Sequence, residues 1–231
     1  RGGEGFDHRP GGPWEGGGGP RGPATAGILV EPVQGEGGIR VVSAEFLHGL
    51  RKLADAHGLV LFFDEVQCGI GRTGRLFAHE WAGVTPDVMA IAKGLGGGFP
   101  LGACLATAQV AAAFAPGSHG STFGGNPLAA AVGNAVLDVV ADDAFLARVR
   151  TTGTILHEGL CALAARFTGV IAEVVPNRAL VMALIDGGLL SVPAGDNVVR
   201  LLPPLTIGMA EVDEALRIIE QACAELAAKA A

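Results

Sequence analysis

The sequence is short of charge, and its few charges leave a negative excess. Asp, Glu, Lys and Arg make up only 17% of the 231 residues, whereas 49% are hydrophobic and the mean hydropathy is +0.43. A chain of this composition can bury a large core, which excludes global disorder. The net charge of −7 and the isoelectric point of about 5.3 argue against nucleic acid or an anionic membrane surface as a partner.

Cysteine is also scarce, and its spacing excludes two kinds of site. Cys68, Cys104, Cys161 and Cys223 lie far apart, with no Cys-x-x-Cys pair and no Cys/His ligand spacing. This argues against a disulfide scaffold and against a zinc site, so we expect no metal. Free cysteines in this number fit a reducing, cytoplasmic compartment.

Long hydrophobic segments are absent as well. The segment 94–137 contains no Asp, Glu, Lys or Arg, but its best apolar window, Leu101–Ala115, is shorter than the ~20 residues that a membrane-spanning helix needs. Residues 1–23 hold ten Gly and four Pro rather than an apolar run, so we expect no signal peptide and an irregular or disordered lead-in. We expect a soluble protein.

From residue 24 the sequence alternates between strand and helix patterns. Solid apolar runs predict strands, and those after the first are typical of strands buried on both faces. A helix is expected between Ser43 and Gly58, where apolar residues recur at helical spacing. Strands alternating with helices indicate an α/β fold with a largely parallel sheet. The four strands are expected at Ala26–Val30, Leu59–Phe63, Val88–Ala92 and Leu101–Thr107.

The second part of the chain predicts a smaller α+β domain. We divide the chain into the lead-in 1–23, a large domain over 24–141 and a small domain over 142–231. The elements expected beyond the last strand are helices over Asn126–Val140 and Asp142–Ala165, a strand over Val170–Val174, the segment Asn197–Leu202 and a helix from Met209.

Two strand ends carry candidate catalytic residues. Asp64 follows a buried strand, where its carboxylate needs a cation or a hydrogen-bond donor; capping of the next loop is an equally good interpretation. Lys93 ends the next strand and opens a glycine run without further charge, so desolvation could lower its pKa and make it a nucleophile. A surface lysine or a phosphate contact is as good an interpretation. A P-loop is excluded because Lys93 precedes the glycines.

The turn His119–Pro127 offers hydroxyls and free N–H groups just before a helix. Such a turn can hold a phosphate at the positive end of the helix dipole, although simple helix capping explains the same residues.

Taken together, these motifs resemble the class III aminotransferases. The resemblance rests on EPVQGEGG over Glu31–Gly38, on DEVQCGIGRTG over Asp64–Gly74, and on Asp196–Leu205, which is similar to the family's substrate-arginine motif. Lys93 and Thr122 follow Asp64 at equal intervals of 29 residues, as in the family. The resemblance implies a three-layer fold of the pyridoxal-phosphate transferase type, with helices flanking a partly parallel sheet, here truncated.

The resemblance also implies the cofactor, pyridoxal 5′-phosphate, and the residues that hold it. Lys93 would bind it covalently and move the substrate's proton, and Asp64 would pair with the ring nitrogen. Val66 would pack on the ring face and Gln67 would bond near the phenolic oxygen. Thr122 would bind the cofactor phosphate across the interface of a homodimer.

For the substrate, the resemblance implies Arg200 as the residue that binds the α-carboxylate and Ser121 as a contact. It also implies Glu36 as the residue that interacts with Arg200 or with the distal amino group of the substrate. The segments Ala92–Ala103 and His119–Pro127 are most similar to family members that transfer an amino group from N-acetylornithine to 2-oxoglutarate in arginine biosynthesis. Two alternatives stay open: an ω-aminotransferase acting on ornithine, 4-aminobutyrate or succinyldiaminopimelate, and a non-catalytic remnant that binds a partner through the former dimer face.

Two departures from the family pattern concern activity. The family's Gly-Thr phosphate-binding turn, its ring-stacking aromatic residue and its early substrate arginine are absent from this sequence. The stretch between Val175 and Leu189 is shorter than in the family, and a strand of the small domain is missing there. We therefore interpret the sequence as part of a class III aminotransferase, with low activity alone.

Overall fold

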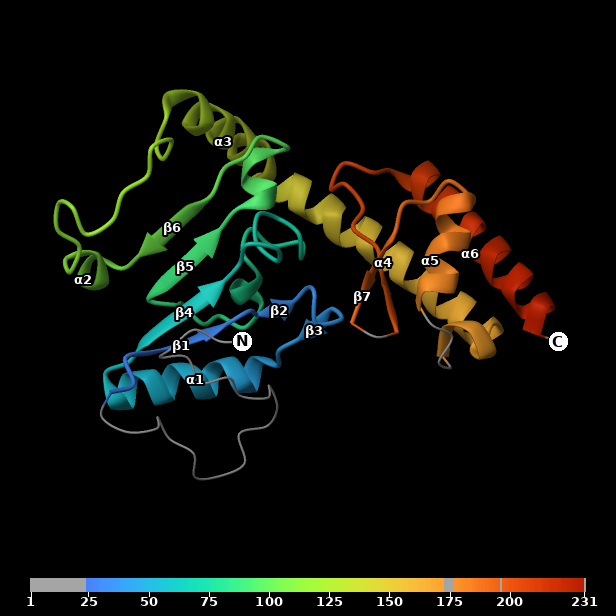
Figure 1. Cartoon of the computed structure of the whole chain (residues 1–231), viewed down its shortest axis with the longest axis horizontal. Helices are drawn as coiled ribbons and strands as arrows, with labels where there is room; N and C mark the ends of the chain where they lie inside the picture. The colour runs from blue at the N-terminus through green and yellow to red at the C-terminus, as the bar shows by residue number, and fades with distance from the viewer. Residues whose placement is uncertain (1–23, 173–176, 196, 231) are drawn as a thin grey trace.

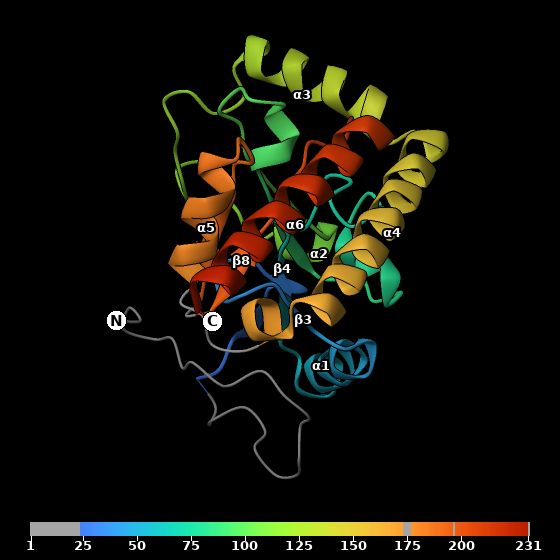
Figure 2. The same ribbon diagram turned by 90° about the vertical axis from the view of Figure 1, so that its right-hand side faces the viewer.

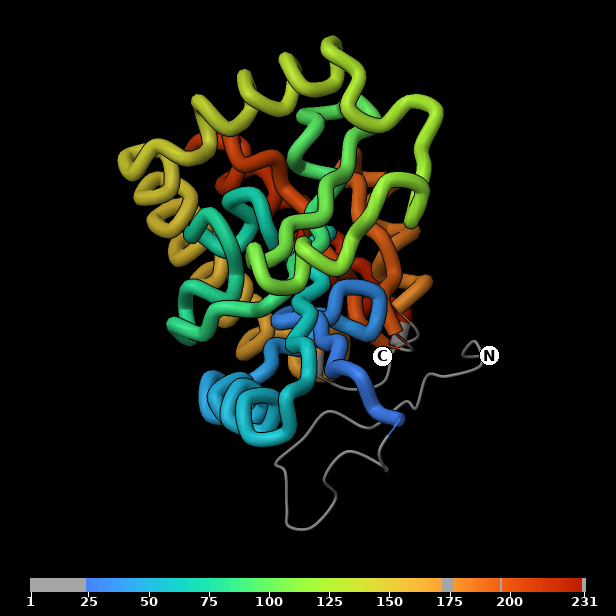
Figure 3. The backbone as a smooth tube through the Cα atoms, turned by 90° about the vertical axis from the view of Figure 1, so that its left-hand side faces the viewer, coloured from blue at the N-terminus to red at the C-terminus, as the bar shows by residue number. Residues whose placement is uncertain are grey.

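The computed structural model describes residues 24–172, 177–195 and 197–230 (Figure 1). The predicted irregular lead-in, residues 1–23, lies outside these residues. The described chain has two units, a sheet with its helices and a bundle of three helices with a small hairpin. Seen from the side in Figure 3, α1 lies at one end of the first unit and α3 at the other.

One four-stranded sheet organises the first unit. Its order is β1-β4-β5-β6; the first three strands are parallel, and β6 runs antiparallel to β5. The predicted α/β class with a partly parallel sheet is confirmed. The strands are β1 (Gly27–Val30), β4 (Val60–Asp64), β5 (Val88–Ile91) and β6 (Ala103–Ala106).

Within the described chain the two central strands are well covered on one face and partly covered on the other, and β6 is exposed. In β4 and β5 every second residue is buried and the residues between them are half-buried, while all four residues of β6 are exposed. The prediction that these strands are buried on both faces is therefore wrong. An apolar run indicates a strand that can be buried on both faces. Whether both faces are buried depends on elements elsewhere in the fold.

Helix α1 (Ala44–His57) covers the β1–β4 end of the sheet. Ser43 caps it, since its Oγ accepts a hydrogen bond from the N–H of Phe46 at 3.2 Å, and Gly58 ends it in the left-handed conformation with φ 64°. Its buried residues form a core with those of β4: Leu47, Leu50, Ala54, Leu59, Leu61, Phe63 and Val84.

Short elements and α3 surround the other end of the sheet. Residues from the strand ends, from α3 and from the start of α4 form a second core there: Ile70, Met89, Ile91, Leu95, Val140, Phe145 and Leu146. The remaining elements of this unit are β2 (Val33–Gln34), β3 (Arg40–Val41), η1 (Ala78–Trp81), η2 (Lys93–Gly96), α2 (Ala108–Ala111) and α3 (Pro127–Val140).

The second unit packs α6 between α4 and α5, as Figure 2 shows. A third core joins these helices: Leu163, Val170, Leu180, Leu184, Ile218, Ile219, Ala222 and Cys223. Because α4 also contributes to the core of the first unit, it is shared, and the proposed boundary between residues 141 and 142 stays a prediction. The elements are α4 (Asp143–Arg166), η3 (Thr168–Ala172), α5 (Asn177–Asp186), β7 (Val192–Ala194), β8 (Val198–Arg200) and α6 (Met209–Ala230).

The strand predicted over Val170–Val174 is wrong for the residues that the structure describes. Thr168–Ala172 form a π-helical turn, in which the N–H groups of Val170 and Ile171 bond the carbonyl of Phe167; residues 173 and 174 lie outside the described chain. Short apolar runs rich in β-branched residues read as strands, but Val170 enters the third core directly from the end of α4.

Candidate functional site

Asp64 and Lys93 lie at the same edge of the sheet. Asp64 is the last residue of β4, its Cα pairs with Ala90 of β5, and Lys93 follows Ala90 by three residues. Parallel neighbouring strands bring their carboxyl ends together, which is where open α/β sheets bind ligands. The half-buried Asp64 accepts a hydrogen bond on Oδ1 from the N–H of Val66 at 3.0 Å, so its carboxylate is oriented by the turn that follows it.

The backbone at Lys93 is strained. Its φ is 44°, in the left-handed region that a residue with a side chain enters at a cost of about 1–3 kcal/mol. Lys93 itself is exposed. The described residues therefore do not cover its amine, and the role of Lys93 stays a prediction.

Lys93 and Gln67 line a common pocket of about 650 Å³. Its wall is formed by the Gly-rich turn after Lys93, by α3 and by the segment around Leu202 and Leu205. Gln67 is held against Gly35, since a side chain at position 35 would collide with the Gln67 amide. The two sequence motifs, one in the β2–β3 region and one after β4, therefore meet at this amide.

Arg200 and Glu36 form an ion pair between the two units. Arg200 lies at the end of β8 and is only 8% exposed, while Glu36, in the β2–β3 turn, is 79% exposed. The distance from Arg200 Nη1 to Glu36 Oε1 is 2.7 Å, and Arg200 Nε is buried with no partner. The contact implied for Glu36 is present. The guanidinium of Arg200 is therefore buried, paired through one nitrogen with an exposed carboxylate, and left with an Nε–H that has no partner.

Ser121 and Thr122 lie apart from this pocket. Both are exposed in the loop before α3, and Ser121 Oγ accepts a hydrogen bond from the N–H of Gly124 at 2.9 Å. The cap of α3 is Asn126, whose Oδ1 accepts from the N–H of Ala129 at 2.9 Å. Capping therefore does not require Ser121 or Thr122, and their roles toward substrate and phosphate stay predictions.

Glu65 is a structural residue of the site that the sequence alone did not reveal. Its carboxylate is fully buried and accepts hydrogen bonds from the N–H groups of Ala78 and His79, at 2.6 and 2.9 Å, and lies 2.7 Å from His79 Nδ1. These bonds tie η1 to the residue next to Asp64. The only local signal was an acidic residue directly after a buried strand, which Asp64 shares.

The buried Cys68 completes this turn as an inert thiol. Burial, and then the charge of Glu65, raise the pKa of Cys68 to about 12. Among the residues that the structure describes, no group of three or more His, Cys, Asp and Glu side chains could hold a metal ion. None of the helices in the same residues is both long and apolar enough to span a membrane.

A carboxylate and a lysine at neighbouring strand ends, with a buried arginine that pairs across the two units, form an aminotransferase-like set of residues. The chain belongs to the class III aminotransferase family, whose model matches residues 20–223. It is 58% identical over 217 residues to the acetylornithine aminotransferase of Mesorhizobium japonicum, which aligns with 89% of this chain and 54% of that relative. The chain thus spans about half the length of the curated relatives that it matches.

Solved structures give the same family and the fold. The N-acetylornithine aminotransferase from Stenotrophomonas maltophilia superposes with a TM-score of 0.80 at 37% identity, covering 89% of this chain and 58% of that one. An ornithine aminotransferase from Toxoplasma gondii, described with partial occupancy of PLP at its active site, gives 0.81 at 33% identity, covering 88% and 52%. The mixed sheet with flanking helices is therefore the aminotransferase fold in part.

Proposed function

We propose that this chain is the cofactor- and carboxylate-binding part of a pyridoxal-phosphate-dependent aminotransferase that transfers an amino group from N-acetylornithine to 2-oxoglutarate, a step of arginine biosynthesis. The observation that carries the proposal is the placement of Lys93 and Asp64 at adjoining strand ends. The substrate is suggested by the 58% identity to an acetylornithine aminotransferase.

The residues at the strand ends suit pyridoxal phosphate. The donor set combines an exposed primary amine, an oriented carboxylate and an amide that lies against Gly35, which match the aldehyde, the ring nitrogen and the phenolic oxygen of that cofactor. The donors for its phosphate are not part of this set, which fits a phosphate held by Thr122 of a second subunit in a homodimer. When bound, pyridoxal phosphate supplies an aldehyde for amino groups and a ring that withdraws electrons.

The roles of the cofactor-side residues follow from their chemistry. Lys93 offers the amine that binds the cofactor and, once substrate displaces it, accepts and returns the proton at the substrate Cα. Asp64 keeps the ring nitrogen protonated through a charged hydrogen bond. Gln67 donates near the phenolic oxygen, and Val66 packs on the ring face.

On the substrate side, Arg200 binds a carboxylate through two parallel N–H donors, one of which is the Nε–H buried without a partner. Glu36 pairs with the Arg200 guanidinium when no substrate is bound, and a substrate carboxylate replaces it. Ser121 contacts the substrate from the loop before α3. The acidic chain with free cysteines acts in the cytoplasm on small amino and oxo acids.

Ornithine is the second candidate substrate. It is suggested by the Toxoplasma ornithine aminotransferase, which matches this chain as well as the acetylornithine enzyme does, with TM-scores of 0.81 and 0.80. The two substrates differ in charge at the far amine, which is acetylated in one and cationic in the other. An assay with both substrates therefore separates the candidates.

The test joins this chain to the N-terminal part of the Mesorhizobium relative, loads the chimera with pyridoxal phosphate and reduces it with borohydride. We expect the label on the peptide containing Lys93, and none on those containing Lys52 or Lys229. The unsubstituted chimera should transfer the amino group to 2-oxoglutarate, with acetylornithine preferred over ornithine. Lys93→Ala should abolish both the label and this transfer. Label on another lysine, or transfer by Lys93→Ala, would refute the assignment.

A further inference from the structure

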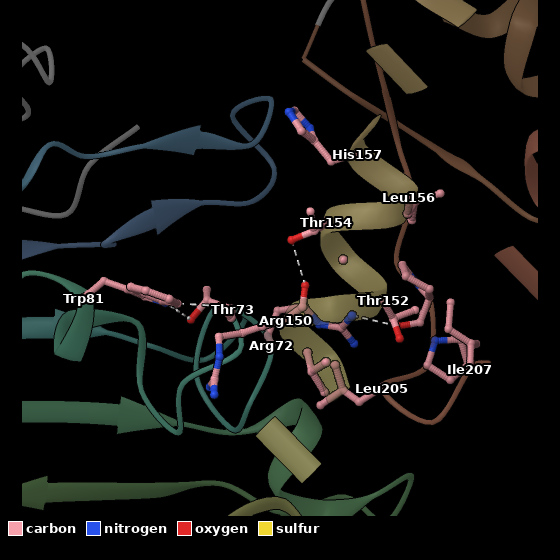
Figure 4. A pocket seen from close by; sticks show the side chains of 14 residues that line it. Arg72, Thr73, Trp81, Arg150, Thr152, Thr154, Leu156, His157, Leu205 and Ile207 are labelled. Atoms are coloured by element: carbon pink, nitrogen blue, oxygen red, sulfur yellow. Dashed lines mark hydrogen bonds between the residues drawn. The ribbon is translucent and has the colours of Figure 1, made fainter. Parts of the chain in front are cut away.

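A second pocket, of about 470 Å³, opens on the other side of Arg72. It lies between residues 72–81, the middle of α4 and residues 203–207 (Figure 4). Arg72 and Leu205 line this pocket as well as the one with Lys93. None of the residues proposed above for cofactor or substrate lines it, so the pocket has no role in the proposed reaction.

The pocket carries positive charge without a counter-ion. Arg72 and Arg150 line it, and no Asp or Glu does. The guanidiniums bond to neutral groups: Arg72 Nη1 donates to the carbonyl of Pro203 at 2.7 Å and Arg150 Nη1 to that of Gly74 at 2.6 Å. Neither arginine forms an ion pair with a carboxylate of the described residues. Burial lowers the pKa of Arg72, as expected for a desolvated cation without an anionic neighbour.

The rest of the wall combines hydroxyls with apolar surface. Thr73, Thr152 and Thr154 contribute hydroxyl groups, and Trp81 and Leu156 contribute apolar surface (Figure 4). Trp81 is fixed in place, because its Nε1–H donates to both the carbonyl and the Oγ1 of Thr73 at 3.2 Å. A ligand that fits must bring one negative charge and a short apolar body.

We propose that this pocket binds a small organic carboxylate with a short branched or linear alkyl tail and no ammonium group. The carboxylate pairs with Arg150 and Arg72, and the tail packs against Trp81. Amino acids are disfavoured, because the lining offers no acidic partner for an ammonium group. The pocket therefore selects a different class of molecule from the amino acids proposed for Arg200.

Binding is tested on the 231-residue chain with 4-methylpentanoate, measured by calorimetry and by tryptophan fluorescence. The neutral 4-methylpentanamide and the cationic 4-methylpentylamine are matched probes. We expect saturable binding of the carboxylate, at least about tenfold weaker binding of the amide, and none of the amine. Equal binding of carboxylate and amide would overturn the proposal, as would binding of inorganic phosphate with no binding of the carboxylate.

Variants locate the site. Arg150→Met removes the guanidinium that also bonds the Gly74 carbonyl, so its fold is checked by circular dichroism and urea unfolding, and it should weaken binding about tenfold. Arg148→Met removes an exposed arginine of the same helix that does not line the pocket, and should leave binding unchanged. Trp81→Phe should lose the fluorescence change while calorimetric binding persists. Equal loss in Arg148→Met and Arg150→Met would show non-specific attraction and refute the site.

Discussion

Arg200 combines deep burial with an unpaired Nε–H, and both properties depend on the shape of its guanidinium. Replacement by lysine keeps the charge but removes the two-pronged geometry. In the chimera, Arg200→Lys should raise the KM for amino acid by about tenfold or more, corresponding to about 1–2 kcal/mol, with cofactor affinity unchanged. Steady-state kinetics and a cofactor titration check this. A loss of cofactor affinity at constant KM would mean that Arg200 serves the cofactor.

The buried thiol of Cys68 predicts a pH effect. Its pKa lies at about 12 in the folded chain, above the ordinary 9.0, so the unfolded chain loses this proton first as the pH rises. The contribution of this thiol to the free energy of unfolding is therefore complete below pH 9.0. It falls between pH 9.0 and about 12, by at most about 1.4 kcal/mol per pH unit. Burial also raises the pKa of Cys223, which acts in the same direction.

Urea unfolding at pH 8 and pH 10 tests this, with Cys68→Ala as the comparison. The variant should lose less stability between the two pH values, whatever its stability at pH 8. A native-state titration should find Cys104 and Cys161, which are exposed, reactive toward a charged thiol reagent and Cys68 protected. Equal pH dependence of the two proteins would contradict the prediction.

At the scale of single residues, the sequence predicted functional positions where they belong to a motif of reactive side chains. The order and spacing of Asp64, Lys93 and Thr122 indicated the family, and the structure places the first two at one sheet edge. The exposure of Lys93 and the burial of Glu65 could not be predicted, because both depend on how other segments pack around the strand ends. The pocket around Arg150 was missed for the same reason.

At the scale of an element, α1 is a helix whose two glycines have opposite effects. Gly58 ends it at φ 64° in open space, so Gly58→Ala should destabilise the chain by about 1 kcal/mol through backbone strain alone. Gly49 lies in the exposed interior of the same helix, also with nothing within 4 Å, and Gly49→Ala should stabilise it by about 0.5–1 kcal/mol. Urea unfolding of both variants provides the measurement; a shift of the same sign in both would refute the argument.

Elements were predicted best where local signals agreed with packing. Ser43 and Gly58 mark the two ends of α1, as predicted. The apolar stripe of the last helix was predicted from its spacing, and its residues Val212, Ile219 and Cys223 are buried. Failure came where local and tertiary preferences differ. The run at Val170 has strand-like residues in a π-helical turn, and α5 occupies a stretch for which no helix was predicted.

At the scale of the whole molecule, the 231-residue chain should bind pyridoxal phosphate weakly and transfer amino groups poorly. It spans about half of its relatives, and most of the phosphate contacts are expected from the other half. Each missing charge-assisted hydrogen bond is worth about 1.5–3 kcal/mol, so several together lower the affinity by orders of magnitude. A spectroscopic titration measures this. Tight, stoichiometric binding with turnover of acetylornithine would contradict the prediction.

The ion pair between Glu36 and Arg200 has a consequence for the order of folding. The two residues are 164 positions apart in the chain, and the entropy of closing so long a loop must be met before the contact forms. The β1–β4 region and the bundle of α4, α5 and α6 are held by contacts that are closer in sequence, so each can form earlier. We therefore expect the contact between Arg200 and Glu36 to form late in folding and to be lost when the two units separate.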